Sequence, residues 1–128
     1  MSVTIVRLGS PRGSDEGVRI GTVRRPPRGV PKTEFASSDY YDVWMPMLSP
    51  TVELMAQAKA ADSPAQWDRF VRKFRSQMNS DDSGRLLDLL ALLSKSANFS
   101  VGCYCDDESH CHRSVLRQLL KERGALIR

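Results

Sequence analysis

The chain has 128 residues, of which 41% are hydrophobic and 27% are charged, and these proportions are typical of one globular domain over residues 1–128. No apolar run approaches the ~20 residues that a membrane span needs, and the opening residues lack the pattern of a secretory signal, so we expect no membrane association. A formal net charge of +4 permits an anionic partner without requiring one.

The first third of the chain predicts two short strands and a basic loop. Residues 3–8 and 18–23 are rich in β-branched side chains, and a turn-rich segment separates them. The second strand runs into the segment RRPPRGVPK, where three prolines forbid a helix and keep the loop extended. This loop contains three arginines, Arg24, Arg25 and Arg28. A cluster of aromatic residues follows the loop, formed by Tyr40, Tyr41 and Trp44.

The middle of the chain predicts three helices. Ser49-Pro50 combines an N-cap with a first-position proline, and we expect a helix from there to about residue 61. Ser63-Pro64 repeats this pattern, and Gln66 completes a capping box. The third helix is expected over residues 85–96. Together with the strand and helix that follow, these helices predict a core that includes Trp67, Phe70, Phe74, Leu89, Val101, Cys103 and Leu116.

All three cysteines and both histidines lie in the last quarter of the chain. Residues 99–105 predict a buried strand, and its alternation places Cys103 and Cys105 on one face. An amphipathic helix follows and ends at Gly124. The order strand–strand–helices–strand–helix predicts an α/β fold, a small mainly parallel sheet with helices packed on it. Three is an odd number of cysteines, which predicts reduced thiols in a cytoplasmic protein.

Several segments with distinctive residues occur in one order: RLGSPR, VRRPPRGV, DVWMPMLSP, a Trp-x-x-Phe helix and, at the end, a cysteine that seven residues separate from CHRSVL. With this ordered set, the chain resembles an uncharacterised bacterial domain-of-unknown-function family that includes the YeaO-like proteins. The resemblance covers nearly the whole chain and implies a compact cytoplasmic α/β domain, but no mechanism. The residues that match the family pattern are Arg25, Pro27, Arg28, Gly29, Cys103, Cys111, His112 and Arg113.

The leading functional prediction is a site for a small anion. If the second strand and the 99–105 strand run parallel, the loops that follow them emerge at one edge of the sheet. Guanidinium groups and free helix amides would then face one crevice, where a phosphate- or nucleotide-like ligand binds. The ligand-binding residues are expected to be Arg24, Arg25, Arg28 and Arg113.

An enzyme version of this prediction gives Cys111 or His112 the catalytic role of nucleophile or general acid–base. We expect Cys111 to be the most reactive thiol, because a helix N-terminus and neighbouring cations stabilise a thiolate. His110-Cys111 and Arg117 also match the spacing used by cysteine-dependent phosphatases, although the residues between them include no glycine for a phosphate cradle.

Three other interpretations stay open. The basic N-terminal third is compatible with a module that binds a nucleic-acid backbone. Cys103, Cys105, Cys111 and His112 can supply four zinc ligands, although this spacing is uncommon in structural zinc sites. The cysteines are also compatible with an ordinary buried strand face. The sequence identifies neither a cofactor nor an oligomeric state.

Overall fold

The computed structural model describes all residues 1–128, and its centre is a four-stranded sheet in which neighbouring strands run parallel. The strands are β1 (Val3–Arg7), β2 (Val18–Gly21), β3 (Val43–Trp44) and β4 (Phe99–Cys103), in the order β1-β4-β2-β3. Helices complete the architecture, so the predicted α/β class with a mainly parallel sheet is confirmed.

The last strand in the sequence lies in the middle of the sheet. Val101 of β4 is aligned with Ile5 of β1 on one side and with Ile20 of β2 on the other. All five residues of β4 are buried, as expected for a parallel strand that is covered on both faces. The carboxyl ends of β1, β2 and β4 therefore meet at one edge of the sheet.

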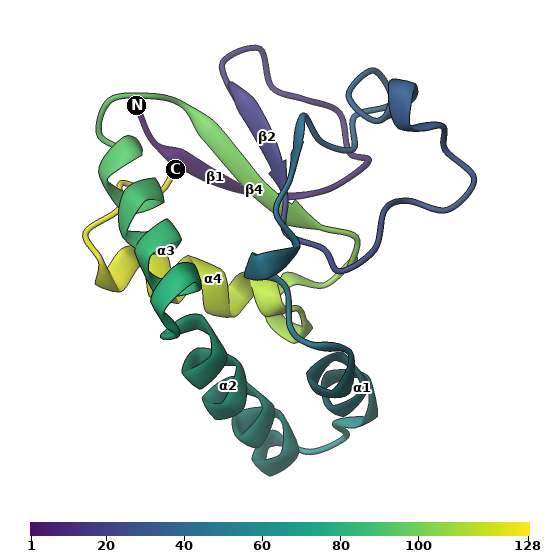
Figure 1. The fold of residues 1–128 in the computed structure, drawn as a ribbon, viewed down its shortest axis with the longest axis vertical. Coiled ribbons are helices and arrows are strands. Elements are labelled where there is room, and N and C mark those ends of the chain that lie inside the picture. The colour runs from purple at the N-terminus through teal and green to yellow at the C-terminus, as the bar shows by residue number, and fades with distance from the viewer.

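Four helices are grouped together beside the sheet, as Figure 1 shows: α1 (Val52–Ala60), α2 (Pro64–Met78), α3 (Asp81–Leu93) and α4 (His112–Glu122). None of them is long and apolar enough to cross a membrane. A short 3-10 helix, η3 (Glu108–His110), lies between β4 and α4. The two ends of the chain lie together, because the backbone N–H of Val3 donates to Leu126 at 2.8 Å.

The helix starts follow the local capping chemistry. The Ser63 hydroxyl accepts from the backbone N–H of Gln66, which confirms the predicted cap of α2. The prediction for the first helix was wrong by two residues, since Thr51 rather than Ser49 is its N-cap and accepts from Leu54. The third helix begins at Asp81, earlier than predicted, where acidic residues in the first turn favour the positive end of the helix dipole.

The main core joins the sheet to α2, α3 and α4, and it contains four of the predicted residues: Phe70, Phe74, Val101 and Leu116. Trp67 is half-buried and packs against this core. The prediction for Leu89 was wrong, because its side chain is 57% exposed. Six of the last eight residues of α3 are leucines, so the pattern does not identify the inward side, which Leu87 and Leu90 occupy.

Cys103 is buried, as predicted, but it belongs to a second and smaller cluster at the carboxyl end of the sheet. Its other members are Leu8, Val23, Tyr41 and Cys111. This cluster closes the sheet below the loops that follow β1, β2 and β4, so it forms the base on which those loops rest.

A buried charged group supports the sheet. The Arg19 side chain is fully buried, and it donates to the Glu16 carboxylate at 2.7 and 2.9 Å. Ser100 of β4 donates to the same carboxylate at 2.6 Å. Burial raises the pKa of Glu16, but the hydrogen bonds from Arg19 and Ser100 outweigh this effect and hold that pKa below its ordinary value.

Candidate functional site

The candidate site lies at the carboxyl edge of the sheet, where the parallel pairing of β2 and β4 brings two loops together. Gly21 is aligned with Gly102, and the pairing continues one residue further because the N–H of Thr22 donates to Gly102 at 2.9 Å. The loop 24–29 and the loop 104–111 therefore leave the sheet side by side. This arrangement is the one on which the anion-site prediction depended.

A cavity of about 650 Å³ opens between these loops and α1. It is bounded by residues 23–28, by the start and one face of α1, by residues 103–105 and by His112. Its size is in the range that holds small-molecule ligands. The lining contains no carboxylate and four cationic side chains: Arg24, Arg25, Arg28 and Lys59.

The three arginines of the loop differ in how they are held. The guanidinium of Arg24 donates to the carbonyl oxygens of Ser49 at 2.8 Å and Pro50 at 3.1 Å, so it ties the loop to the segment before α1. Arg25 and Arg28 are exposed at the cavity, and their guanidinium groups have no protein partner. These two side chains are therefore free to bind a ligand.

Two tyrosines supply flat surfaces to the cavity. The rings of Tyr40 and Tyr104 meet edge to face, with centroids 6.3 Å apart. The Tyr104 hydroxyl donates to the carbonyl oxygen of Arg25 at 2.9 Å, which fixes the arginine loop against the end of β4. Burial raises the pKa of Tyr104, and this hydroxyl therefore stays protonated at neutral pH.

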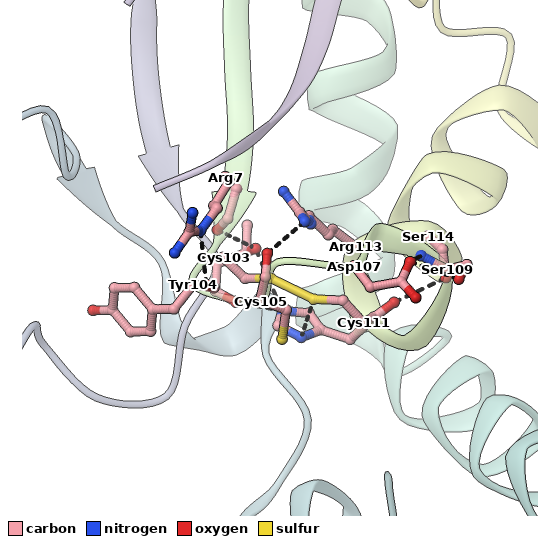
Figure 2. The surroundings of a disulfide bond; sticks show 12 residues. Arg7, Cys103, Tyr104, Cys105, Asp107, Ser109, Cys111, Arg113 and Ser114 are labelled. Atoms are coloured by element: carbon pink, nitrogen blue, oxygen red, sulfur yellow. Dashed lines mark hydrogen bonds between the residues drawn. A yellow bond between two sulfur atoms is a disulfide. The ribbon is translucent and has the colours of Figure 1, made fainter. Parts of the chain in front are cut away.

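A pair of cysteines, Cys103 and Cys111, lies at the base of the cavity. Cys103 and Cys111 are joined in a disulfide (Figure 2), so the prediction of three reduced thiols differs from the structure. Their Cα atoms are 7.9 Å apart. The expectation that Cys105 shares the buried strand face was wrong, because β4 ends at Cys103 and the free Cys105 is exposed.

His112 is the first residue of α4 and is buried beside the two cysteines. Its Nε2 donates to the carbonyl oxygen of Thr22 at 2.6 Å, since a carbonyl can only accept. The other ring nitrogen, Nδ1, then carries a lone pair, and it lies 3.8 Å from the Sγ of Cys111. Burial lowers the pKa of His112 to about 4, and the bond to Thr22 only partly opposes this shift, so the ring is neutral at pH 7.

The structure places Arg113 outside the cavity. Its side chain is buried, and Nη2 donates to the carbonyl oxygen of Cys105 at 2.6 Å, as the dashed line in Figure 2 shows. Arg113 therefore holds the loop between β4 and α4 in place. Arg117 pairs with Glu108 at 2.7 Å, and residues 112–116 are helical, so the cysteine-phosphatase spacing does not form a phosphate cradle.

The structure thus brings together Arg24, Arg25 and Arg28 with Cys103, Cys105 and His112 around one cavity. Sequence reasoning missed Lys59, Tyr40 and Tyr104 as members of the lining. Lys59 reaches the cavity from α1, and a lysine on an exposed helix gives no sequence signal of such a role. Tyr104 had a signal, since it directly follows the strand whose end was predicted to form the site.

Residues 3–124 match the family model DUF488-N3a, which is described as the active DUF488-N3 subclade. The match extends over β1 through α4, so it includes every residue of the cavity described above. No curated protein and no solved structure matches the chain.

Proposed function

The chain belongs to the DUF488-N3a family, a family of unknown function, and from this premise we propose that its cavity binds a small anionic molecule, phosphate- or nucleotide-like. The ligand lies between the loop Arg24–Gly29 and the start of α4. The observation that carries the proposal is the lining itself, with four cationic side chains and no carboxylate.

The charged part of the ligand binds Arg25 and Arg28. Neither guanidinium is engaged within the protein, so no existing ion pair has to break when a ligand arrives. A planar guanidinium matches the geometry of a phosphate or carboxylate, and a charge-assisted hydrogen bond contributes about 1.5–3 kcal/mol. Lys59 adds positive charge from the opposite wall of the cavity.

The rest of the ligand extends from the arginines towards His112. A cavity of about 650 Å³ is larger than a phosphate ion needs, so the ligand includes an organic part. The rings of Tyr40 and Tyr104 offer surfaces against which a base or sugar can pack. We therefore favour a nucleotide or sugar phosphate over inorganic phosphate. The proposal takes the protein as cytoplasmic, the location that the sequence predicts.

We also propose an enzymatic role for the same site, because it combines a histidine with cysteines beside the cavity. The neutral imidazole of His112 lines the cavity and can accept a proton at Nδ1. The sulfur of Cys111 lies 3.8 Å from that nitrogen, and Cys111 in its reduced form is the candidate nucleophile. Arg28 orients the substrate, and Arg113 acts only by holding the loop that leads to α4.

Thermal unfolding of the full chain tests the proposal, with inorganic phosphate, AMP, ADP and glucose 6-phosphate as probes. A pocketed ligand stabilises the protein saturably, by about 2.7 kcal/mol at a concentration 100 times its Kd. We expect Arg25→Ala/Arg28→Ala to abolish the shift. The matched control is Arg72→Ala/Arg85→Ala, which removes two exposed arginines of α2 and α3 and should preserve it.

The absence of any shift, or an equal loss in both double variants, would contradict the proposal. Nucleic-acid binding gives a different result, because affinity for a polyanion backbone falls steeply with salt and shows no saturation by a mononucleotide. A steep salt dependence with single-stranded DNA, together with no response to mononucleotides, would therefore replace the small ligand with a nucleic-acid backbone.

A further inference from the structure

We propose that Cys103, Cys111 and His112 form a zinc site when the two thiols are reduced, with three protein ligands and a fourth position open to the cavity. The three residues come from the end of β4 and the start of α4, so the fold itself brings them together. This inference does not depend on the anion-binding proposal, and either one can fail without the other. A zinc ion would occupy Cys111 Sγ and His112 Nδ1, so it would replace the nucleophile and base roles considered for these two residues above.

The ligand atoms are already close enough to share one ion. The sulfur atoms of Cys103 and Cys111 and a ring nitrogen of His112 all lie within 4.8 Å of one another. Zinc bonds of about 2.3 Å to sulfur and 2.0–2.1 Å to nitrogen, at tetrahedral angles, put sulfur and nitrogen about 3.6 Å apart. The observed separation of Cys111 Sγ from His112 Nδ1 is 3.8 Å.

The hydrogen bonding of His112 prepares Nδ1 for a metal. Histidine ligands in metal sites commonly donate their other ring N–H to a carbonyl or carboxylate, which fixes the tautomer and the ring orientation. Here Nε2 donates to the carbonyl oxygen of Thr22 at 2.6 Å, and Nδ1 faces the sulfur of Cys111. The ring therefore needs no rearrangement to present its lone pair to an ion.

The backbone around the two cysteines also suits a metal better than a permanent disulfide. The Cα atoms are 7.9 Å apart, whereas bridged cysteines usually have Cα atoms 4.4–6.8 Å apart. Two thiolates that bind one zinc ion have sulfur atoms about 3.8 Å apart, a separation that follows from the same bond lengths. After reduction, the sulfur atoms of Cys103 and Cys111 can therefore separate to the distance that zinc requires, while their Cα atoms stay 7.9 Å apart.

The fourth position faces the cavity, because Cys103 and His112 both line it. Cys105 is exposed and lies outside the cluster, so the four-ligand set that the sequence suggested is reduced to three. Sites with three protein ligands and one open position are typical of catalytic zinc, which lowers the pKa of a bound water to about 7. Such a water would lie at the base of the cavity.

Cobalt titration of the reduced full chain, after removal of metals with a chelator, tests the inference. Cobalt takes the place of zinc and gives a thiolate-to-metal absorption band only when sulfur is a ligand. We expect one equivalent to bind and zinc to displace it. Cys105→Ser is the matched control and should bind cobalt as the wild type does. Cys103→Ser and Cys111→Ser should weaken cobalt binding by more than about 100-fold, beyond the 10–100-fold effect of replacing a residue that only hydrogen-bonds to a metal ligand.

A further variant separates loss of a ligand from loss of folding. In His112→Gln the side-chain amide can still donate to Thr22, but no nitrogen lone pair replaces Nδ1. We expect this variant to keep its far-UV circular dichroism and to lose cobalt affinity. No sulfur band in the wild type, wild-type affinity in Cys111→Ser, or an equal loss in Cys105→Ser would each overturn the inference. A nucleotide-induced thermal shift that persists in chelator would leave the proposed function intact in those cases.

Discussion

The Nε2 atom of His112 lies 2.6 Å from the carbonyl oxygen of Thr22, so one hydrogen bond connects the start of α4 to the residue that follows β2. These two points carry the loops that form the cavity. The bond therefore does two things, because it holds the loops in register and leaves Nδ1 as the nitrogen that faces Cys111. Replacement of His112 should therefore have two distinct effects. Loss of the Nε2 bond should lower the stability of the protein, and loss of Nδ1 should remove the nitrogen that faces Cys111.

The first prediction concerns the stability of the metal-free, reduced protein. His112→Ala leaves the Thr22 carbonyl without this donor and creates a cavity beside Phe74, whose ring lies edge to face with the imidazole. We expect a loss of about 2–4 kcal/mol in the free energy of unfolding, measured by urea denaturation. His112→Gln keeps a donor and most of the volume, so it should lose less than half as much. An equal loss in the two variants would contradict the role given to the bond.

The second prediction separates the arginines of the cavity. Arg24 donates to the carbonyls of Ser49 and Pro50, whereas Arg25 has no side-chain partner. Arg24→Ala should lower the free energy of unfolding by about 1–2 kcal/mol, because Ser49 keeps a second donor in Gln77 and part of the bonding survives. Arg25→Ala should stay within about 0.5 kcal/mol of the wild type.

The difference in stability between Arg24→Ala and Arg25→Ala can be measured as a difference in their urea midpoints, provided that the m-value is unchanged. The same two variants should then behave differently with a ligand. Arg25→Ala should weaken ligand binding without a loss of stability, and Arg24→Ala should affect both. If Arg25→Ala is the more destabilising of the two, the assignment of Arg24 to the scaffold and Arg25 to the ligand is wrong.

The third prediction is a pH dependence that originates at Glu16. The pKa of Glu16 is held below its ordinary value, so its ion pair with Arg19 stabilises the protein at neutral pH, and this contribution disappears as the pH falls through the lowered pKa. Glu16→Gln should cost about 3–5 kcal/mol at pH 7, because it leaves the buried Arg19 without its counter-charge.

The cost of Glu16→Gln should begin to shrink as the pH falls below about 4.5, where the carboxyl takes up a proton in the unfolded wild-type chain but stays ionised in the folded one. The two proteins should converge in stability as the pH falls further, through the lowered pKa of the folded state. Urea denaturation at several pH values between 7 and 3 measures this convergence, and effects of other carboxylates cancel between the two proteins. Ser100→Ala removes only one hydrogen bond to Glu16 and should cost about 1 kcal/mol at pH 7. A cost of Glu16→Gln that stays constant down to pH 3 would exclude this linkage.

The sequence identified the segments of this fold better than it identified their ends. The strand that begins at Phe99, predicted over residues 99–105, and the helix after Cys111 were found because apolar periodicity reports burial directly. Cys105 was misplaced because alternation applies only while the strand continues, and nothing in the sequence marks Cys103 as its last residue. Leu89 was misplaced because a helix rich in leucine does not reveal which side faces the core.

The site was predictable where it depends on topology and unpredictable where it depends on distant packing. The arginine loop and His112 share one cavity because β2 and β4 are parallel neighbours. The sequence predicted a mainly parallel sheet but not the order of its strands. Lys59 joins them from a helix whose position no local pattern reveals. Arg113 was expected beside the ligand, but its side chain turns to the Cys105 carbonyl instead.

The last prediction concerns the order in which the cysteines react, for which the structure supports an expectation opposite to that from the sequence. The sequence suggested that Cys111 is the most reactive thiol, yet its side chain is buried and joined to Cys103, whereas Cys105 is free and exposed. Alkylation of the native protein without reductant, followed by mass spectrometry, should therefore label Cys105 alone. After mild reduction, Cys103 and Cys111 should label slowly, because each is about 2% exposed or less. Zinc added after reduction should protect these two and leave the labelling of Cys105 unchanged.

Reduction in denaturant gives the control in which all three cysteines react. Labelling of Cys111 before Cys105 in the native, unreduced chain would refute the assignment of Cys105 as the reactive thiol.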